Sequence, residues 1–321
     1  MPLPATWWML TVSAVALMYV APASLSALES KGNDDGEVML NTSKAGGARA
    51  QFNRTCKCGK KFTRIVGGTE TYRHEYPWQA ALVQTATGEQ FCGGSLITNQ
   101  HILTAAHCLQ GFGAEDVVVH LRDHNLTNPS ETNLVERNVT TIYTHHLYDP
   151  VTNNNDIAII HLNKTVRISA RLLPVCLPSS ALPQYGNKEA VVTGWGATSS
   201  GGPSSSTLLE VTVPVLTQKH CQQRTGYQPS EITSRMLCAG AAGLDSCQGD
   251  SGGPLVHLDK GQRYDQIGIV SFGRSCGLEN FPGVYTRVNK FLRWIEKRTL
   301  DGVYCAGFSF PTEIPSLKFR L

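Results

Sequence analysis

Three short segments of the sequence hold side chains that could carry out nucleophilic attack on a carbonyl. They are TAAHC (104–108), NNDIAII (154–160) and DSCQGDSGGPLV (245–256). In the third segment Ser251 stands between Gly249 and Gly252, and glycines on both sides allow backbone amides and a substrate to approach closely. A serine in such a turn could act as a nucleophile while amide donors hold a developing oxyanion.

Each segment has an ordinary structural explanation when it is taken alone. A histidine beside a cysteine is usually structural, an aspartate before a strand is usually a turn residue, and a glycine-rich serine turn is usually only a turn. The chemical interpretation therefore depends on finding His107, Asp156 and Ser251 in one chain, in this order and with these flanking residues.

Together, the three segments strongly resemble the chymotrypsin–trypsin family of serine proteases. Six motifs follow the family's order: IVGG (65–68), TAAHC (104–108), DIA (156–158), GWG (194–196), GDSGGP (249–254) and PGVYTRV (282–288). The resemblance runs from residue 65 to about residue 298, roughly three quarters of the chain. It implies an all-β, trypsin-like fold of two antiparallel Greek-key β-barrels with a C-terminal α-helix.

The resemblance also implies a catalytic role for individual residues. Ser251 would attack the scissile carbonyl, His107 would take its proton and pass it to the leaving amine, and Asp156 would orient the imidazole. The backbone amides of Gly249 and Ser251 would form the oxyanion hole. Ser271 matches the family's serine that supports the buried aspartate.

Substrate specificity is implied by the same resemblance. Asp245, six residues before Ser251, matches the floor of the family's specificity pocket, where a buried carboxylate selects a cationic side chain. Gly273 and Gly283 match the pocket walls, and the Ser246 hydroxyl could bind a lysine ammonium. We therefore expect cleavage after Arg or Lys. Phe272 stands where the family usually has Trp, so it keeps an apolar wall but lacks the indole N–H.

Activation would occur between Arg64 and Ile65, where trypsin-like proteases convert their precursors. The new ammonium group of Ile65 would pair with Asp250 and thereby order the oxyanion hole. The partners implied are protein or peptide substrates with Arg or Lys at the cleaved position, an activating trypsin-like protease and proteinaceous protease inhibitors.

The ten cysteines favour disulfides over a zinc site, because they are spread and contain no CxxC pair. The resemblance implies the pairs Cys92–Cys108, Cys221–Cys238 and Cys247–Cys276. For the other four cysteines it favours Cys58–Cys176, which leaves Cys56–Cys305. The swapped arrangement, Cys56–Cys176 with Cys58–Cys305, stays open. In either case the pro-segment should remain attached after cleavage.

The amino terminus and the sequons indicate secretion. Residues 5–21 are almost unbroken apolar and are followed by small residues, so we expect a signal peptide at 1–26, with a retained anchor as the alternative. Five N-x-S/T sequons are candidate glycosylation sites: Asn41, Asn53, Asn125, Asn138 and Asn163. A net charge of +3 without a basic run gives no reason to expect nucleic-acid binding.

The remaining chain divides by composition. Residues 27–64 are polar and lack apolar periodicity, which indicates a flexible pro-segment; 65–300 form the expected peptidase domain, and 301–321 a loosely held tail. Short runs rich in Val, Ile and Leu between turn residues predict antiparallel strands. They lie at 93–106, 116–121, 156–162, 189–196, 208–216, 253–258 and 264–272. Apolar residues at helical spacing predict a helix over 287–298.

Two other functions fit the sequence less well than a protease does. A catalytically silent homologue acting as a binding or cofactor module would usually lack a triad residue, and all three are present. A disulfide-stapled structural glycoprotein would leave GDSGGP and Arg64-Ile65 unexplained. No cofactor or metal is predicted. Asp123 and Glu131 are weak candidates for calcium ligands, because their spacing does not match the trypsin loop cleanly.

Overall fold

The computed structural model describes residues 49–61, 70–181, 184–198 and 201–311. The expected signal peptide lies outside the described residues, as do most of the pro-segment and the junction between Arg64 and Ile65. Within the described residues, no helix is long and apolar enough to cross a membrane.

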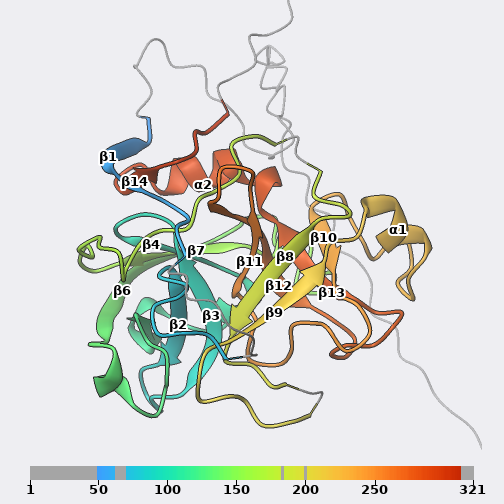
Figure 1. Cartoon of the computed structure of the whole chain (residues 1–321), viewed down its shortest axis with the longest axis horizontal. Coiled ribbons are helices and arrows are strands. Elements are labelled where there is room, and N and C mark those ends of the chain that lie inside the picture. The colour runs from blue at the N-terminus through green and yellow to red at the C-terminus, as the bar shows by residue number, and fades with distance from the viewer. Residues whose placement is uncertain (1–48, 62–69, 182–183, 199–200, 312–321) are drawn as a thin grey trace, which may run out of the picture. The chain divides into compact units, whose positions relative to one another are not determined.

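Strands make up most of the regular structure in the described part of the chain (Figure 1). They are β1 (Gln51–Lys57), β2 (Gln79–Gln84), β3 (Gln90–Leu96), β4 (His101–Thr104), β5 (Val117–Leu121), β6 (Val135–Thr144), β7 (Ala158–Leu162), β8 (Glu189–Gly194), β9 (Leu209–Pro214), β10 (Met236–Ala239), β11 (Pro254–Leu258), β12 (Tyr264–Phe272), β13 (Gly283–Arg287) and β14 (Val303–Ala306). The α-helices are α1 (Gln218–Gln223) and α2 (Leu292–Arg298). Short 3₁₀ turns cover His107–Leu109, Ala114–Asp116, Pro129–Glu131 and Val288–Lys290.

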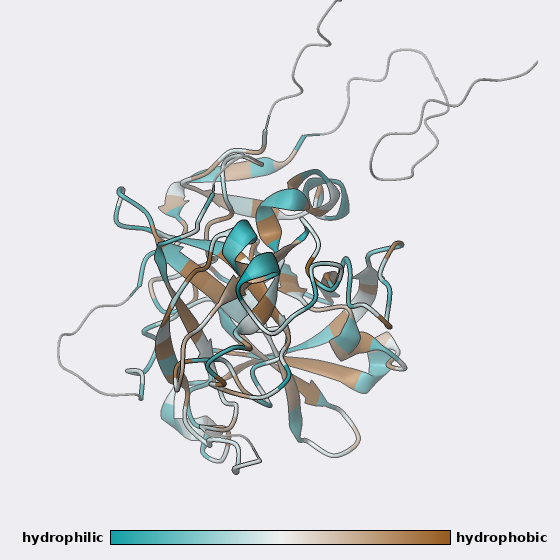
Figure 2. Cartoon of the chain, turned by 90° about the vertical axis from the view of Figure 1, so that its right-hand side faces the viewer, coloured by the Kyte–Doolittle hydropathy of each residue, from teal (hydrophilic) through white to brown (hydrophobic). Residues whose placement is uncertain are grey.

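The first half of the peptidase region closes into a six-stranded antiparallel barrel in the order β2-β3-β4-β7-β6-β5. Its strands are rich in Val, Ile and Leu, whose branched side chains pack well in a sheet. Leu82, Leu103, Val119 and Ile159 are fully buried inside it. Figure 2 shows the hydrophobic colour running along strands and the hydrophilic colour gathering on loops and helices.

The second half forms a six-stranded antiparallel sheet in the order β10-β13-β12-β11-β8-β9. The chain just after β9 meets the end of β10 through a bridge between Val215 and Ala239, so the two edge strands approach one another. Val213, Leu255 and Ile267 are fully buried in its core. The predicted all-β fold with two antiparallel barrel-like sheets is thus confirmed.

The C-terminal helix packs on the first barrel. Leu292 and Ile295 are buried in the same hydrophobic cluster as Leu103 and Ile159. The sequence predicted a helix over 287–298, whereas the α-helix begins at Leu292 and a 3₁₀ turn over Val288–Lys290 precedes it. The apolar spacing identified the buried face but did not distinguish the tight turn from the helix.

A small parallel sheet corrects two expectations about the chain ends. Residues 51–57 were expected to be flexible and 301–321 loosely held, yet β1 and β14 pair in parallel. Phe52 stacks on Tyr304 with ring centroids 5.5 Å apart, and Phe308 and Phe310 are buried beside them. Aromatic packing and a disulfide between the strands therefore order these segments as far as residue 311. Residues 312–321 lie outside the described part.

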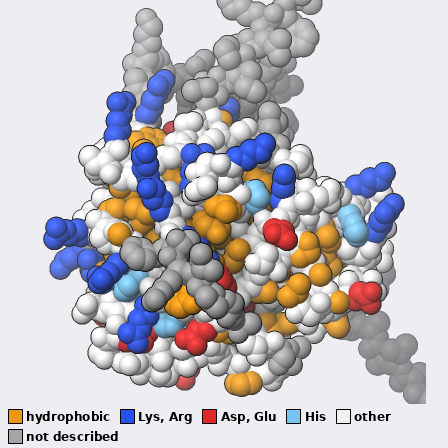
Figure 3. Space-filling model, viewed as in Figure 1, with side chains coloured by type: hydrophobic (Ala, Val, Ile, Leu, Met, Phe, Trp, Pro, Cys, Tyr) orange, Lys and Arg blue, Asp and Glu red, His pale blue; other side chains and the backbone are white. Residues whose placement is uncertain are grey.

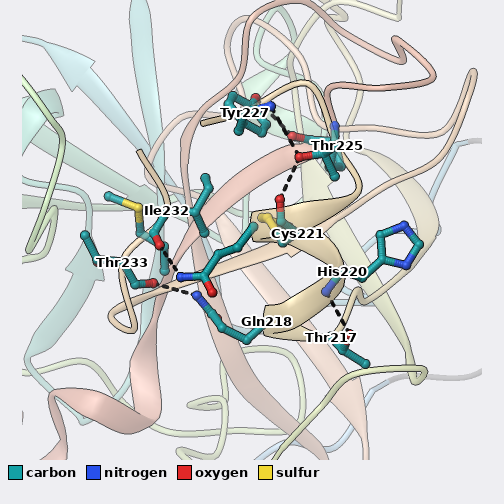
Figure 4. Close-up of a disulfide and its surroundings, with 12 residues drawn as sticks. Thr217, Gln218, His220, Cys221, Thr225, Tyr227, Ile232 and Thr233 are labelled. Atoms are coloured by element: carbon teal, nitrogen blue, oxygen red, sulfur yellow. Dashed lines mark hydrogen bonds between the residues drawn. A yellow bond between two sulfur atoms is a disulfide. The ribbon is translucent and has the colours of Figure 1, made fainter. Parts of the chain in front are cut away.

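Helix α1 was not predicted from the sequence. It is six residues long, and the side chain of Thr217 caps it by accepting a hydrogen bond from the His220 amide at 3.1 Å. Figure 4 shows the helix and its disulfide. The side-chain amide of Gln218 donates a hydrogen bond to the carbonyl oxygen of Thr233, and the hydroxyl of Thr225 donates one to the carbonyl oxygen of Cys221. These side-chain bonds, not apolar periodicity, hold the helix in place.

Candidate active site

The two strands that carry His107 and Asp156 are neighbours in the first barrel. β4 and β7 pair with Thr104 opposite Ala158. The chain leaving β4 and the chain entering β7 therefore emerge at the same edge of the barrel. His107 follows in a 3₁₀ turn and Asp156 lies two residues before the start of β7, so strand pairing brings the two side chains together.

Asp156 is fully buried and receives several hydrogen bonds. Its Oδ2 lies 2.7 Å from Nδ1 of His107, and its Oδ1 accepts the backbone N–H of His107 at 2.9 Å. From the second sheet, the Ser271 hydroxyl donates to Oδ2 at 2.5 Å, and Thr286 donates to the Asp156 carbonyl oxygen at 2.6 Å. A buried carboxylate with this many donors is held in one orientation and can in turn orient the imidazole.

Ser251 lies on a glycine turn that packs against the first barrel. Gly249 and Gly252 have φ of +98° and +76°, which favour glycine. The Gly93 amide donates to the Ser251 carbonyl oxygen at 2.7 Å. A Cβ on Gly252 would lie 3.0 Å from Sγ of Cys108, the neighbour of His107 in the chain. The turn thus adjoins the His107 segment, although no hydrogen bond between the described residues joins the Ser251 hydroxyl to the His107 ring.

The amides around Ser251 fall into two groups. The amides of Asp250, Gly252 and Gly253 donate to backbone carbonyl oxygens. Among the described residues, the amides of Gly249 and Ser251 have no such acceptor. Both of the amides that the sequence assigned to an oxyanion hole are therefore available to a ligand oxygen.

Asp245 is a desolvated carboxylate held only by amides. It accepts the amide of Ser246 at 2.8 Å and that of Gly277 at 3.2 Å, and the Gly283 amide also contributes. Desolvation outweighs these bonds and raises the pKa of Asp245 to about 6. No ion pair among the described residues involves it.

Two glycines that the resemblance assigned to the pocket walls differ in their surroundings. A Cβ on Gly283 would lie 2.4 Å from Oδ1 of Asp245, so a larger residue there would displace the carboxylate. A Cβ on Gly273 would meet only the Ser275 carbonyl oxygen, at 3.7 Å, so that side is open. The Ser246 hydroxyl accepts a hydrogen bond from Tyr285 at 3.1 Å and keeps its own proton to donate.

Asp250 is a second desolvated carboxylate, next to the nucleophile position. It accepts the amides of Gly196 and Cys247, each at 2.9 Å. Desolvation raises the pKa of Asp250 to about 6. A Cβ on Gly194 or Gly196 would lie 2.0 or 2.6 Å from Oδ1 of Asp250, which explains the two glycines of the GWG motif. Sequence reasoning singled out this motif but did not connect it with Asp250.

Arg64 and Ile65, the expected activation residues, lie outside the described residues. Among the sequons, Asn41 also lies outside them. Asn53, Asn138 and Asn163 are exposed, and Asn125 is half-buried.

All ten cysteines are paired in the described structure. The disulfides are Cys56–Cys305, Cys58–Cys176, Cys92–Cys108, Cys221–Cys238 and Cys247–Cys276. These are the pairs that the resemblance favoured, and the swapped alternative is not the one formed. Cys247–Cys276 joins the segment that contains Asp245 to the segment that contains Gly273.

The two candidate calcium ligands have different polar neighbours in the structure. Asp123 Oδ2 lies 3.4 Å from Nδ1 of His120, whereas Glu131 pairs with Arg73 at 3.0 Å. Each carboxylate thus has a different neighbour.

Figure 3 shows basic side chains in small groups over one face, interspersed with uncharged and hydrophobic atoms.

Two antiparallel six-stranded sheets with a His–Asp–Ser set near their junction define the class of trypsin-like serine endopeptidases, which are hydrolases. The chain belongs to the trypsin family, because residues 65–295 match that family's sequence profile. This membership agrees with the resemblance in the six motifs.

Three known relatives are between 36% and 42% identical to this chain. Serine protease 1 of Rattus norvegicus is 42% identical over 236 residues, which cover 73% of this chain and 89% of that protein. Proclotting enzyme of Tachypleus tridentatus is 41% identical over 247 residues, 73% of this chain and 65% of the relative. Transmembrane protease serine 11G of Rattus norvegicus is 36% identical over 253 residues, 77% of this chain and 59% of the relative. The chain thus spans about three fifths of the length of the latter two.

Proposed function

We propose that this protein is a secreted, trypsin-like endopeptidase, made as an inactive precursor, that hydrolyses peptide bonds after Arg or Lys. The observation that carries the specificity is Asp245. It is a desolvated carboxylate with amide donors, an open side at Gly273 and no cationic partner among the described residues. A buried charge of this kind gains most from a cation supplied by a substrate.

In the proposed reaction, Oγ of Ser251 attacks the scissile carbonyl carbon while Nε2 of His107 takes the hydroxyl proton. Nδ1–H of His107 stays bonded to Asp156, whose charge stabilises the imidazolium. The amides of Gly249 and Ser251 bind the carbonyl oxygen as it becomes an oxyanion. The His107 proton then passes to the leaving amine, the C–N bond breaks, and water repeats the sequence to release the acyl group from Ser251.

Activation would depend on Asp250. After a cut between Arg64 and Ile65 by a trypsin-like protease, the new ammonium group would pair with this carboxylate. The desolvation that raises the pKa of Asp250 supports this, because an arriving cation would compensate it. Since Asp250 lies between Gly249 and Ser251, the pairing would order both oxyanion-hole amides.

Secretion is supported by the apolar segment 5–21 and by the disulfides, which form in oxidising compartments. Exposed Asn53, Asn138 and Asn163 are proposed glycosylation sites. The proposed partners are protein substrates with Arg or Lys at the cleaved bond, an activating protease and proteinaceous inhibitors.

The test is covalent labelling of activated protein with a serine-reactive phosphonate that carries a basic side chain. We expect mass added at Ser251, no labelling of Ser251→Ala, and much slower labelling by a matched phosphonate with an acidic side chain. Labelling of another serine, or equal rates with the two reagents, would contradict the proposal.

Precursor activation has its own test. Wild-type protein treated with trypsin should gain activity as an Ile65 amino terminus appears, whereas Arg64→Gln should stay a single inactive chain. On gels without reductant the cleaved protein should run as one species, and reductant should release a fragment that ends at Arg64. Release without reductant would contradict the predicted attachment.

A further inference from the structure

Two histidines and an aspartate meet at a place that the proposed catalysis does not use. His101 on β4 and His161 on β7 are directly opposite in the antiparallel register. Their rings lie nearly parallel, 14° apart, with centroids separated by 4.8 Å. Asp301, between α2 and β14, reaches both rings: Oδ1 lies 3.3 Å from Nε2 of His101 and Oδ2 lies 3.2 Å from Nε2 of His161.

The buried histidine is fixed with one nitrogen toward the carboxylate. The side chain of His101 is only 1% exposed, and its Nδ1 lies 2.8 Å from Oγ1 of Thr98. The same Thr98 oxygen accepts the Gln100 amide at 3.1 Å and has a second lone pair for a proton on Nδ1. Thr98 can thus accept a proton from Nδ1, and in that tautomer Nε2 has a lone pair that faces the Asp301 carboxylate.

Nε2 of His101 is buried and has no hydrogen-bond partner among the described residues. The Asp301 oxygen is near it, but the two are not aligned as a donor and an acceptor. A lone pair and a carboxylate so close together would repel one another unless a cation lay between them.

The three ligand atoms lie within 4.8 Å of one another. Zinc binds imidazole nitrogen and carboxylate oxygen at about 2.0–2.2 Å, so ligands of one tetrahedral ion are roughly 3.3–3.6 Å apart. Both nitrogen–oxygen distances already fall close to that value. In the Nδ1–H tautomer, the hydrogen bond that Nδ1 of His101 donates to Thr98 Oγ1 is the support that metal-binding histidines usually have.

We propose that His101, His161 and Asp301 form a Zn²⁺ site that fastens the C-terminal segment to the first barrel. Asp301 is 58% exposed on its side chain and His161 is 21% exposed, so the ion has a path from solvent. Water would complete the coordination. The other group of potential ligands in the described residues, around His107, contains only cysteines already paired in a disulfide.

The proposed ion would stabilise the fold rather than take part in peptide hydrolysis. Asp301 is followed by β14, which holds β1, and its carbonyl oxygen also accepts a hydrogen bond from Gln100 at 3.1 Å. Bridging Asp301 to two barrel strands would therefore couple the tail to the barrel. This inference does not depend on the proposed specificity or activation.

The test is calorimetric titration of the metal-free, uncleaved precursor with Zn²⁺, with thermal unfolding measured in parallel. We expect one equivalent of Zn²⁺ to bind, and the midpoint of unfolding to rise by about 5 °C or more at a hundredfold excess over Kd. Mg²⁺ should have no such effect, because two imidazoles suit zinc and not magnesium. No binding, or no rise in the midpoint, would overturn the proposal.

Variants locate the bound ion. His161→Ala and Asp301→Asn should each weaken Zn²⁺ binding at least tenfold and remove the thermal shift, while their unfolding without zinc should stay cooperative. His220→Ala, which removes an exposed histidine on α1, is the matched control and should behave as wild type. If His107→Ala rather than His161→Ala abolishes binding, the ion sits at the catalytic histidine and the proposal is wrong.

Discussion

Two kinds of desolvated carboxylate lie within the active-site region, and they differ in the groups that form hydrogen bonds with them. Asp156, which enters β7 of the first barrel, is saturated by groups of the chain itself: the His107 ring and amide and the Ser271 hydroxyl. Asp245 and Asp250, in the loop before β11 of the second sheet, receive only amides, and desolvation raises the pKa of each to about 6.

The difference separates orientation from recognition. A carboxylate that must hold an imidazole in one position needs all its partners in place before substrate arrives. A carboxylate that must attract a cation from elsewhere is more effective if no cation of the chain already neutralises it. In the proposed function, a cationic substrate side chain pairs with Asp245 and the Ile65 ammonium group pairs with Asp250.

The largest effect should follow from Asp156→Asn. A side-chain amide can turn its N–H toward Nδ1 of His107, whereas a carboxylate can only accept there. The imidazole would then carry its proton on Nε2, which is the wrong tautomer for taking the Ser251 proton. We expect kcat of the activated enzyme to fall by about 10⁴-fold, the magnitude known for the same change in the family's template enzyme. Affinity for benzamidine, a small amidinium ligand, should not change. An equal loss of kcat and of benzamidine affinity would remove the distinction between the two kinds of carboxylate.

Asp245→Ser should have the complementary effect. Removing one member of a desolvated ion pair costs roughly 3–5 kcal/mol, or about 10² to 10³·⁵-fold in kcat/KM for Arg and Lys substrates. Thermal stability should be unchanged or higher, because a poorly solvated carboxylate is removed. Peptide-library profiling with a melting curve checks both, and an undiminished preference for basic residues would contradict the assignment.

Asp250→Asn tests the second unpaired carboxylate. In the uncleaved precursor we expect a melting temperature close to wild type. The oxygen of the new side-chain amide can still accept a hydrogen bond from one of the two backbone N–H groups that Asp250 binds. After cleavage, the Ile65 ammonium would lack its counter-charge and activity should fall at least a hundredfold. Acetylating the Ile65 amine of the activated wild type should have a similar result. Full activity with that amine blocked would show that this pair is not the switch.

The smallest effect is a pH dependence of benzamidine binding. Because the pKa of Asp245 is raised to about 6, the carboxyl keeps its proton below that pH and is ionised above it. Only the ionised form attracts an amidinium, so Kd should be constant above pH 7 and rise about tenfold per pH unit below pH 6. In Asp245→Ser this dependence should disappear. A Kd independent of pH down to pH 4 would mean that the carboxyl is not desolvated.

Much of the barrel architecture was predictable because it is encoded locally. Residues 264–272 form the predicted strand with the same bounds, since an apolar run lies between polar turns. The strand over 51–57 was missed because QFNRTCK shows no alternation of buried positions. It exists through contacts with residues about 250 positions away in the sequence, including the Phe52–Tyr304 stack, and local patterns do not contain that information.

The site was predictable in its side chains and less so in its backbone. His107, Asp156 and Ser271 were named from motifs, and the structure joins them by hydrogen bonds. The Gly277 amide donates a hydrogen bond to Asp245, and Gly194 approaches Asp250 closely. Both contacts join segments that are far apart in the sequence. The raised pKa values follow from that packing, so no spacing in the sequence could reveal them.

Two disulfides at the end of β1, from Cys56 within it and Cys58 just after it, close the chain into nested rings. Cys56–Cys305 closes a ring across a separation of 249 residues, and Cys58–Cys176 closes a smaller ring of separation 118 within it. A cut between Arg64 and Ile65 lies in both rings. It would leave one ring, which follows the chain from Cys176 to Cys305 and closes through residues 56–58 and the two disulfides. Residues 65–175 would become an arm that the backbone joins to this ring at Cys176. One hydrolysed bond would thus free an amino terminus to move while every part of the molecule stays covalently connected.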